Sequence, residues 1–155
     1  MKDEKRDVAT NRKAFHDYFV LDRYEAGIEL AGTEVKSIRA GNVNLKDSFC
    51  TIKNGELFIR GMHISPYSHG NIFNKDPVRP RRLLMHKKEI SRLNAKIMTD
   101  GVTLIPLSVY FRGSLIKIEL GLCKGKKLHD KRDSAAERES KRDMERILKE
   151  RRSIE

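Results

Sequence analysis

The apolar residues of this 155-residue chain stop abruptly after Cys123. Residues 124–155 hold twelve Lys and Arg and eight Asp and Glu but only five large apolar side chains, so they cannot build a core of their own. A folded domain must therefore lie before this point, in a length of chain that can bury a core without disulfides or a structural metal. The pattern predicts one globular domain over residues 15–123 and a basic tail over 124–155.

The apolar residues before Cys123 recur mostly at the period of two that is typical of β-strands. Two such segments flank Asn54-Gly55, a dipeptide that accepts the positive φ angles of a type I′ hairpin turn. A second hairpin is predicted from the apolar runs 102–111 and 114–123, with Pro106 indicating an edge or a bulge. Residues 18–30 predict a strand, a kink or bulge at Ala26-Gly27 and a further strand.

Two segments have the spacing of helices instead. Residues 33–39 carry apolar side chains three apart between two glycines, which predicts a helix of about two turns. Residues 83–98 predict a longer helix with one apolar stripe against the sheet. Between the two predicted helices, residues 65–82 contain three prolines and a basic cluster, which favours a long surface loop. The basic cluster consists of Arg79, Arg81 and Arg82.

The two ends of the chain carry weaker signals. Residues 1–14 are polar, which predicts a flexible basic arm before the first strand near Phe15. In the tail, a capping box at Ser134 precedes favourable i,i+4 charge pairs, so this segment is expected to be disordered when free and helical when bound. The fold class is predicted as mainly β, a small antiparallel barrel of the oligonucleotide-binding type with two or three short helices.

A net charge of +11 favours a polyanionic partner. A membrane is the weakest candidate, since no stretch approaches the roughly 18 apolar residues of a spanning helix. The N-terminus lacks the apolar segment of a secretory signal, so a cytoplasmic location is expected. Neither catalytic motifs nor short-spaced metal ligands occur, so no enzyme activity, cofactor or metal is predicted, and Cys50 and Cys123 are interpreted as buried hydrophobes.

The clearest binding signal is the basic run Lys124–Arg132, in which Gly125 allows close approach of the backbone to a phosphate. Charge alone leaves phosphate binding and a solvated basic linker equally open. His129 could stack on an RNA base or be merely solvated. Aromatic residues on the predicted strands, such as Phe19 and Phe49, are expected mostly in the core rather than in a stacking platform. Two carboxylates, Glu25 and Glu34, would have to accept hydrogen bonds from base amino groups or 2′-hydroxyls.

Four segments in order along the chain resemble the SsrA-binding protein family. They are Asn11–Tyr18, Tyr24–Ile28, Gly32–Gly41 and Lys124–Arg132, and the resemblance covers almost the whole sequence. Within it, Thr33 stands where the family often has a large aromatic residue, and Leu128 stands where polar residues also occur.

This resemblance implies a protein that binds the tRNA-like domain of transfer-messenger RNA (tmRNA). It implies an RNA contact surface at Glu25, Leu84 and Lys117, and a tail for the decoding centre and mRNA channel of the small ribosomal subunit. Elongation factor Tu and alanyl-tRNA synthetase would be indirect partners through the RNA. The residues implied as neighbours of the contact surface are Asn11, His16, Lys36, Arg39, Lys124, Gly125, Lys126 and Lys127. Those implied to serve the ribosome are His129, Asp130, Lys131 and Arg132.

Two other classes remain open from the sequence. A general single-strand-binding barrel would bind unstructured RNA or DNA equally well. A structural ribosomal protein would stay on the ribosome without the RNA. No self-complementary apolar patch is evident in the sequence, so a monomer is expected.

Overall fold

The computed structural model describes residues 5–68 and 74–126. The chain divides into two units, 1–124 and 125–155, and the first unit holds the folded domain. The strands are β1 (Lys5–Thr10), β2 (Tyr18–Ile28), β3 (Val43–Asn44), β4 (Phe49–Lys53), β5 (Glu56–Arg60), β6 (His63–Ile64), β7 (Arg81–Leu84), β8 (Thr103–Arg112) and β9 (Leu115–Gly125). The helices are α1 (Arg12–Asp17), α2 (Gly32–Arg39) and α3 (Lys87–Asp100).

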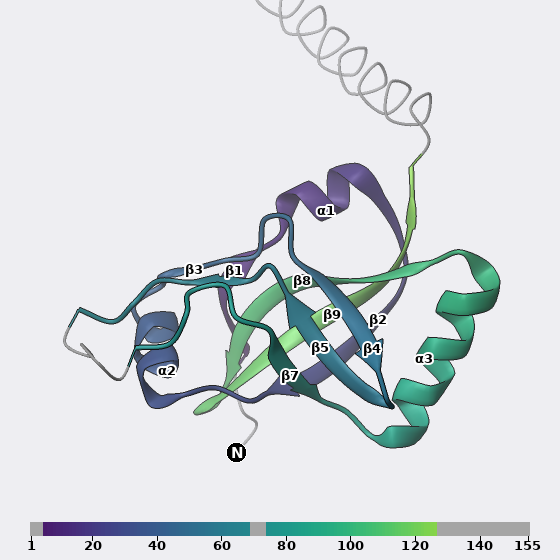
Figure 1. The fold of residues 1–155 in the computed structure, drawn as a ribbon. Helices are drawn as coiled ribbons and strands as arrows, with labels where there is room; N and C mark the ends of the chain where they lie inside the picture. Colours follow the sequence, from purple (N-terminus) through teal and green to yellow (C-terminus); the bar gives the residue numbers. More distant parts are fainter. Residues whose placement is uncertain (1–4, 69–73, 127–155) are drawn as a thin grey trace, which may run out of the picture. The chain divides into compact units, whose positions relative to one another are not determined.

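Seven strands form one sheet in the order β1-β8-β9-β2-β7-β5-β4, and β3 pairs separately with β6. The β1–β8, β8–β9, β2–β7, β7–β5 and β5–β4 pairs are antiparallel. The sheet is strongly curved, with β7, β5 and β4 in front of β8, β9 and β2, and β4 contacts β8 (Figure 1). The predicted mainly β, antiparallel fold with short helices is confirmed.

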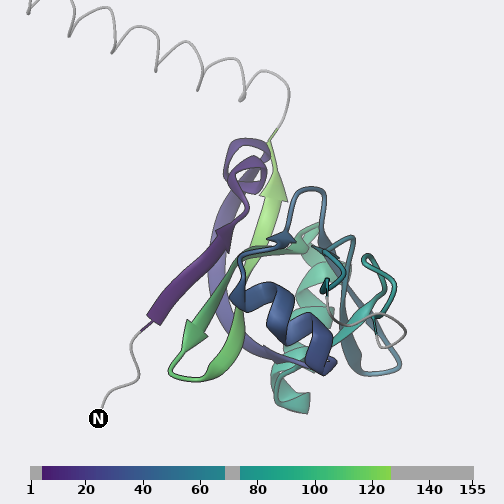
Figure 2. The ribbon, with the colours of Figure 1, turned by 90° about the vertical axis from the view of Figure 1, so that its left-hand side faces the viewer.

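The core lies inside this curve. It contains apolar side chains from both walls of the sheet, and it is completed by Ile38 of α2 and by Ile90 and Leu93 of α3. The two helices lie at different sides of the sheet, α2 next to β3 and α3 at the far side (Figures 1 and 2). Cys50 and Cys123 are buried and free, as predicted, and burial raises the pKa of the Cys123 thiol to about 11.

A bulge in β8 allows this strand to contribute side chains to two separate apolar cores. The register of β8 against β9 shifts between Pro106 and Ser108, which confirms the bulge predicted from Pro106. Because the shift interrupts the alternation of side chains, Leu104 and Val109 face the main core while Ile105 and Leu107 pack under α1. Gly121 leaves room for Leu107, because a Cβ at this position would lie 2.8 Å from Leu107 Cδ1.

Local turn and helix predictions also hold. Asn54 and Gly55 have φ angles of 53° and 75°, as a type I′ turn requires. The helix predicted over residues 33–39 is α2. Residues Tyr18–Ile28 form one strand, β2, instead of the two strands predicted on either side of Ala26-Gly27.

The flexible arm predicted over residues 1–14 is wrong for the part that the structure describes. Lys5–Thr10 forms β1, which pairs with β8, and Val8 packs against the main core. Backbone groups supply these hydrogen bonds, so a polar segment can cover the edge of an apolar strand. Helix α1 follows, and Asn11 caps its N-terminus.

The prediction for residues 65–98 also needs correction. Residues Arg81–Leu84 form the interior strand β7, which pairs with β2 and β5, and the helix begins only at Lys87. Arg81 is buried in the interior, 1% exposed, instead of lying on a surface loop. Leu83 fitted the helical spacing, yet it belongs to the alternating pattern of β7.

Candidate nucleic-acid interface

Three residues named by the resemblance surround one cavity of about 490 Å³: Glu25, Leu84 and Lys117. They come from β2, β7 and β9, which are neighbours in the sheet. Gly27 also lines this cavity and leaves room for the Leu84 side chain, because a Cβ there would lie 3.3 Å from Leu84 Cβ. The remaining lining residues are Met85, His86 and Glu89. We call this space the Glu25 cavity.

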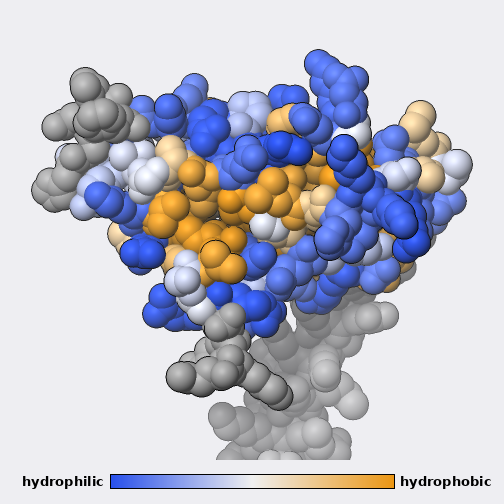
Figure 3. Space-filling view, turned by 90° about the horizontal axis from the view of Figure 1, so that it is seen from below, coloured by the Kyte–Doolittle hydropathy of each residue, from blue (hydrophilic) through white to orange (hydrophobic). Residues whose placement is uncertain are grey.

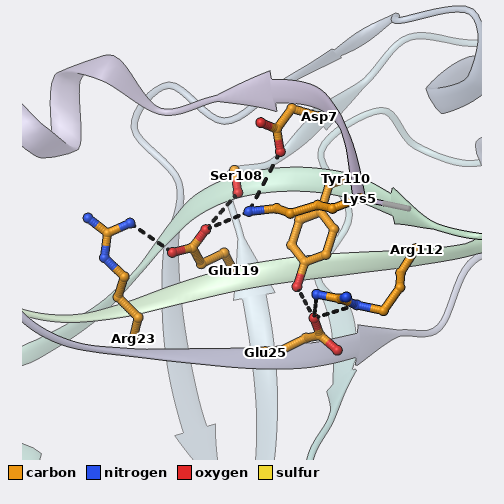
Figure 4. A network of polar contacts seen from close by, with 8 residues as sticks. All are labelled: Lys5, Asp7, Arg23, Glu25, Ser108, Tyr110, Arg112 and Glu119. Carbon is orange, nitrogen blue, oxygen red and sulfur yellow. Dashed lines mark hydrogen bonds and ion pairs between the residues drawn. The ribbon is translucent and has the colours of Figure 1, made fainter. Parts of the chain in front are cut away.

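The carboxylate of Glu25 is held by two residues of the neighbouring sheet region (Figure 4). Tyr110 donates its hydroxyl hydrogen to Oε2, and Arg112 donates to the same oxygen from Nη2 at 2.9 Å and from Nε at 3.1 Å. The Tyr110 hydrogen bond lowers the pKa of Glu25, and although partial burial opposes it, the Arg112 contacts add to the lowering. Glu25 is therefore an ionised acceptor at neutral pH, and no described residue donates to its Oε1.

A second group of charges holds Tyr110 in turn. Lys5 Nζ lies 4.6 Å from the centre of the Tyr110 ring and 3.4 Å from Glu119 Oε2. Glu119 also accepts a hydrogen bond from Arg23 at 2.9 Å (Figure 4). Strand β1 thus supports Glu25 indirectly, through Tyr110, because it carries Lys5.

Replacing Tyr110 by phenylalanine is expected to raise the pKa of Glu25 toward its ordinary range, because the main hydrogen bond that stabilises the carboxylate is lost. Carboxyl ¹³C NMR titration of the full chain measures this pKa. Tyr24→Phe is the matched control, since the Tyr24 hydroxyl donates to Asp22 at 3.0 Å and not to Glu25. An unchanged Glu25 pKa in Tyr110→Phe would contradict the assignment.

The chemistry of the cavity suits a nucleotide. The lysine can bind a phosphate, Leu84 offers an apolar surface that is 46% exposed, and Glu25 Oε1 can accept from a base amino group or a 2′-hydroxyl. When the molecule is seen from below the orientation of Figure 1, one group of apolar side chains is surrounded by hydrophilic residues (Figure 3). Phe19 and Phe49 were expected mostly in the core, but each is 43% exposed, so the sequence pattern underestimated the exposure of these aromatic side chains.

The other residues expected near the RNA do not line this cavity. His16 is exposed, with Nδ1 2.8 Å from Asp17 Oδ1, and Arg39 is exposed at the end of α2. Lys36 Nζ lies 5.3 Å from the centre of the Tyr67 ring. Lys124 and Gly125 are exposed at the end of β9. Lys126 is the last described residue; Lys127, His129, Asp130, Lys131, Arg132 and the predicted tail helix lie outside the described residues.

Asn11 has a structural role inside the protein. Its side chain accepts a hydrogen bond from the Ala14 backbone N–H at 3.2 Å and donates one to the Pro106 carbonyl oxygen at 2.9 Å. The residue is 4% exposed, so we expect no direct contact between Asn11 and RNA. An Asn one residue before a helix is a recognisable cap, and this signal was available in the sequence.

Glu34 likewise belongs to the interior. Its carboxylate binds Arg81 Nε at 2.6 Å and Arg79 Nη2 at 2.5 Å. Burial raises the pKa of Glu34, but hydrogen bonds from Arg79, the Ala31 N–H and Arg81 outweigh it and keep this pKa below its ordinary value. The carboxylate is therefore a counterion for buried arginine and does not face RNA.

Two kinds of feature are absent from the described parts of the chain, residues 5–68 and 74–126. No helix there is long and apolar enough to cross a membrane. No group of three or more His, Cys, Asp or Glu side chains there could hold a metal ion.

Sequence reasoning missed Tyr110 and Arg112, the two residues that hold Glu25. Nothing local to β8 indicates a contact with Glu25, which lies 85 residues away from Tyr110 in the chain. Only the pairing of the strands brings these side chains together.

Comparison with known proteins gives a consistent result. The chain matches the family model described as SmpB protein over residues 8–150. It is 62% identical over 149 residues to the SsrA-binding protein of Acetivibrio thermocellus, which covers 96% of this chain and 97% of the relative. The SsrA-binding protein of Carboxydothermus hydrogenoformans is 60% identical over 144 residues, covering 93% and 97%.

A solved structure described as "tmRNA-SmpB: a journey to the center of the bacterial ribosome" contains a chain with the same fold. Its TM-score is 0.67 at 46% identity, and the match covers 82% of this chain and 93% of that chain. Family model, relatives and solved structure therefore agree, and this chain belongs to the SmpB family of SsrA-binding proteins.

Proposed function

We propose that this protein binds the tRNA-like domain of tmRNA through the Glu25 cavity and delivers this RNA to stalled ribosomes. In this role it takes the place of the missing codon–anticodon helix, so that the nascent chain is tagged and the ribosome is released. The observation that carries the proposal is the meeting of Glu25, Leu84 and Lys117 around one cavity. The names of the relatives and the tmRNA-SmpB ribosome structure support it.

Several finer points belong to the same proposal. The curved sheet is of the oligonucleotide-binding type, and residues 124–155 serve the decoding centre and mRNA channel, with His129, Asp130, Lys131 and Arg132 at the ribosome. The protein acts as a cytoplasmic monomer and an adaptor without enzyme activity of its own. Elongation factor Tu and alanyl-tRNA synthetase work with it only through the RNA.

A competition assay tests the proposed function. Labelled tmRNA is bound to the full chain at physiological salt and challenged with excess elongator tRNA and with unstructured RNA of equal length. We expect neither competitor to displace the label. Equal competition by unstructured RNA would instead identify a general single-strand-binding protein.

Lys117→Ala is expected to weaken tmRNA binding about tenfold, because it removes a charged contact of the cavity. Filter binding or fluorescence anisotropy gives the dissociation constant. Lys53→Ala removes the same charge from the exposed end of β4 and serves as the control. Equal effects of the two changes would show that only overall charge matters.

A further inference from the structure

The outward face of α3 carries three cations that the Glu25 cavity does not use: Lys88, Arg92 and Lys96. All three are exposed, whereas Ile90 and Leu93 of the same helix are buried. At 100° per residue, successive members of this set are only about 40° apart around the helix, so they form one stripe. We call these residues the α3 stripe.

The cations of the α3 stripe repel one another in the free protein. Each step is an i,i+4 pair of like charges, which destabilises a helix. Two cations, Lys87 and Lys88, open the helix, where the helix dipole disfavours positive charge. Some cations elsewhere in the described residues are paired, as Lys5 and Arg23 are with Glu119. In contrast, the ion pairs among the described residues include none of the stripe cations.

The stripe also lies next to the proposed RNA site. His86 and Glu89, at the start of α3, line the Glu25 cavity, so the stripe begins at its rim. From there it follows the helix, and Lys96 is close enough to Asp22 of β2 to help lower the pKa of that carboxyl. Figure 1 shows α3 along one side of the curved sheet. One step of four residues advances about 6 Å along a helix, which is comparable to the spacing of successive phosphates in an RNA strand.

We propose that the α3 stripe binds consecutive phosphates of the same RNA strand that enters the Glu25 cavity. The inference rests on the proposed function, because it takes the RNA from there, but it adds a surface that none of the expected site residues belongs to. Binding the polyanion relieves the repulsion within the stripe. The stripe extends the interface from the cavity along α3 and contributes affinity without reading base identity.

Two triple variants of the full chain with equal charge test this proposal. K88Q/R92Q/K96Q removes the stripe, and K46Q/K53Q/K75Q removes three exposed lysines from other surfaces. Glutamine has nearly the helix propensity of lysine and arginine, so α3 is retained, and thermal melting checks this. Dissociation constants for labelled tRNA-like RNA are measured from low to high salt for both variants and for the original chain.

Loss of three phosphate contacts is expected to reduce the slope of log affinity against log salt concentration by about 2–3, and to weaken binding at least tenfold at low salt. The control variant is expected to change the slope by less than half as much. Equal slopes in the two variants would overturn the proposal. The original chain is also titrated with unstructured RNA of equal length, and equal affinity for the two RNAs would show separately that the proposed function fails.

Discussion

Replacing Glu34 by alanine is expected to lower the free energy of unfolding by about 3–5 kcal/mol, because it leaves a buried arginine without its counterion. The side chain of Arg81 is completely buried and that of Glu34 is 4% exposed. Arg81 also donates to the Met62 carbonyl oxygen at 2.8 Å and to the Pro77 carbonyl oxygen at 3.1 Å. The pair thus joins α2 to the first residue of β7, and its loss affects both elements.

Urea unfolding measures this effect, and Glu29→Ala is the matched control. Glu29 is an exposed carboxylate that lies 3.6 Å from Arg82, and such surface pairs contribute at most about 1 kcal/mol. A loss below about 1 kcal/mol in Glu34→Ala would contradict the structural role. The folded state lowers the pKa of Glu34, so its contribution is present above the unfolded-state pKa and is lost as pH falls through the lower, folded-state pKa. The difference between the two chains should therefore shrink in acid.

Deleting residues 133–155 is expected to abolish tagging of stalled nascent chains while tmRNA affinity stays within about twofold. The cavity and stripe groups all precede this segment. The segment holds seven Lys and Arg and seven Asp and Glu, so its removal leaves the net charge at +11 and the nonspecific attraction to RNA unchanged. The proposed ribosome contacts of the tail, in contrast, lose their C-terminal part.

In vitro translation of an mRNA without a stop codon, followed by detection of the tag, measures the first effect, and filter binding measures the second. A chain with residues 133–155 scrambled keeps length and composition and tests whether the order of residues matters. Full tagging by the truncated chain would contradict the proposed role of the tail. A tenfold loss of RNA affinity would show that the tail also belongs to the RNA site.

The sequence by itself determined the features that depend on a few neighbouring residues. The Asn54-Gly55 hairpin, the helix α2 and the bulge at Pro106 all follow from the backbone preferences of the residues at these positions. The site residues of the cavity came from the resemblance to a family, and composition could not have selected Glu25 or Leu84 from other exposed residues.

Tertiary structure decided what depends on pairing between distant segments. Strand β1 exists because β8 offers it an edge, and residues 81–84 are a strand because β2 and β5 lie on either side of them. Glu34 and Arg81 are 47 residues apart, and their ion pair depends on how α2 packs against the start of β7. The hydrogen bond from Tyr110 to Glu25 depends in the same way on the register of the sheet. A local pattern of residues reflects the conformational preferences of one turn or one strand. A cavity lined by residues of three strands forms only after packing has set the register and curvature of those strands.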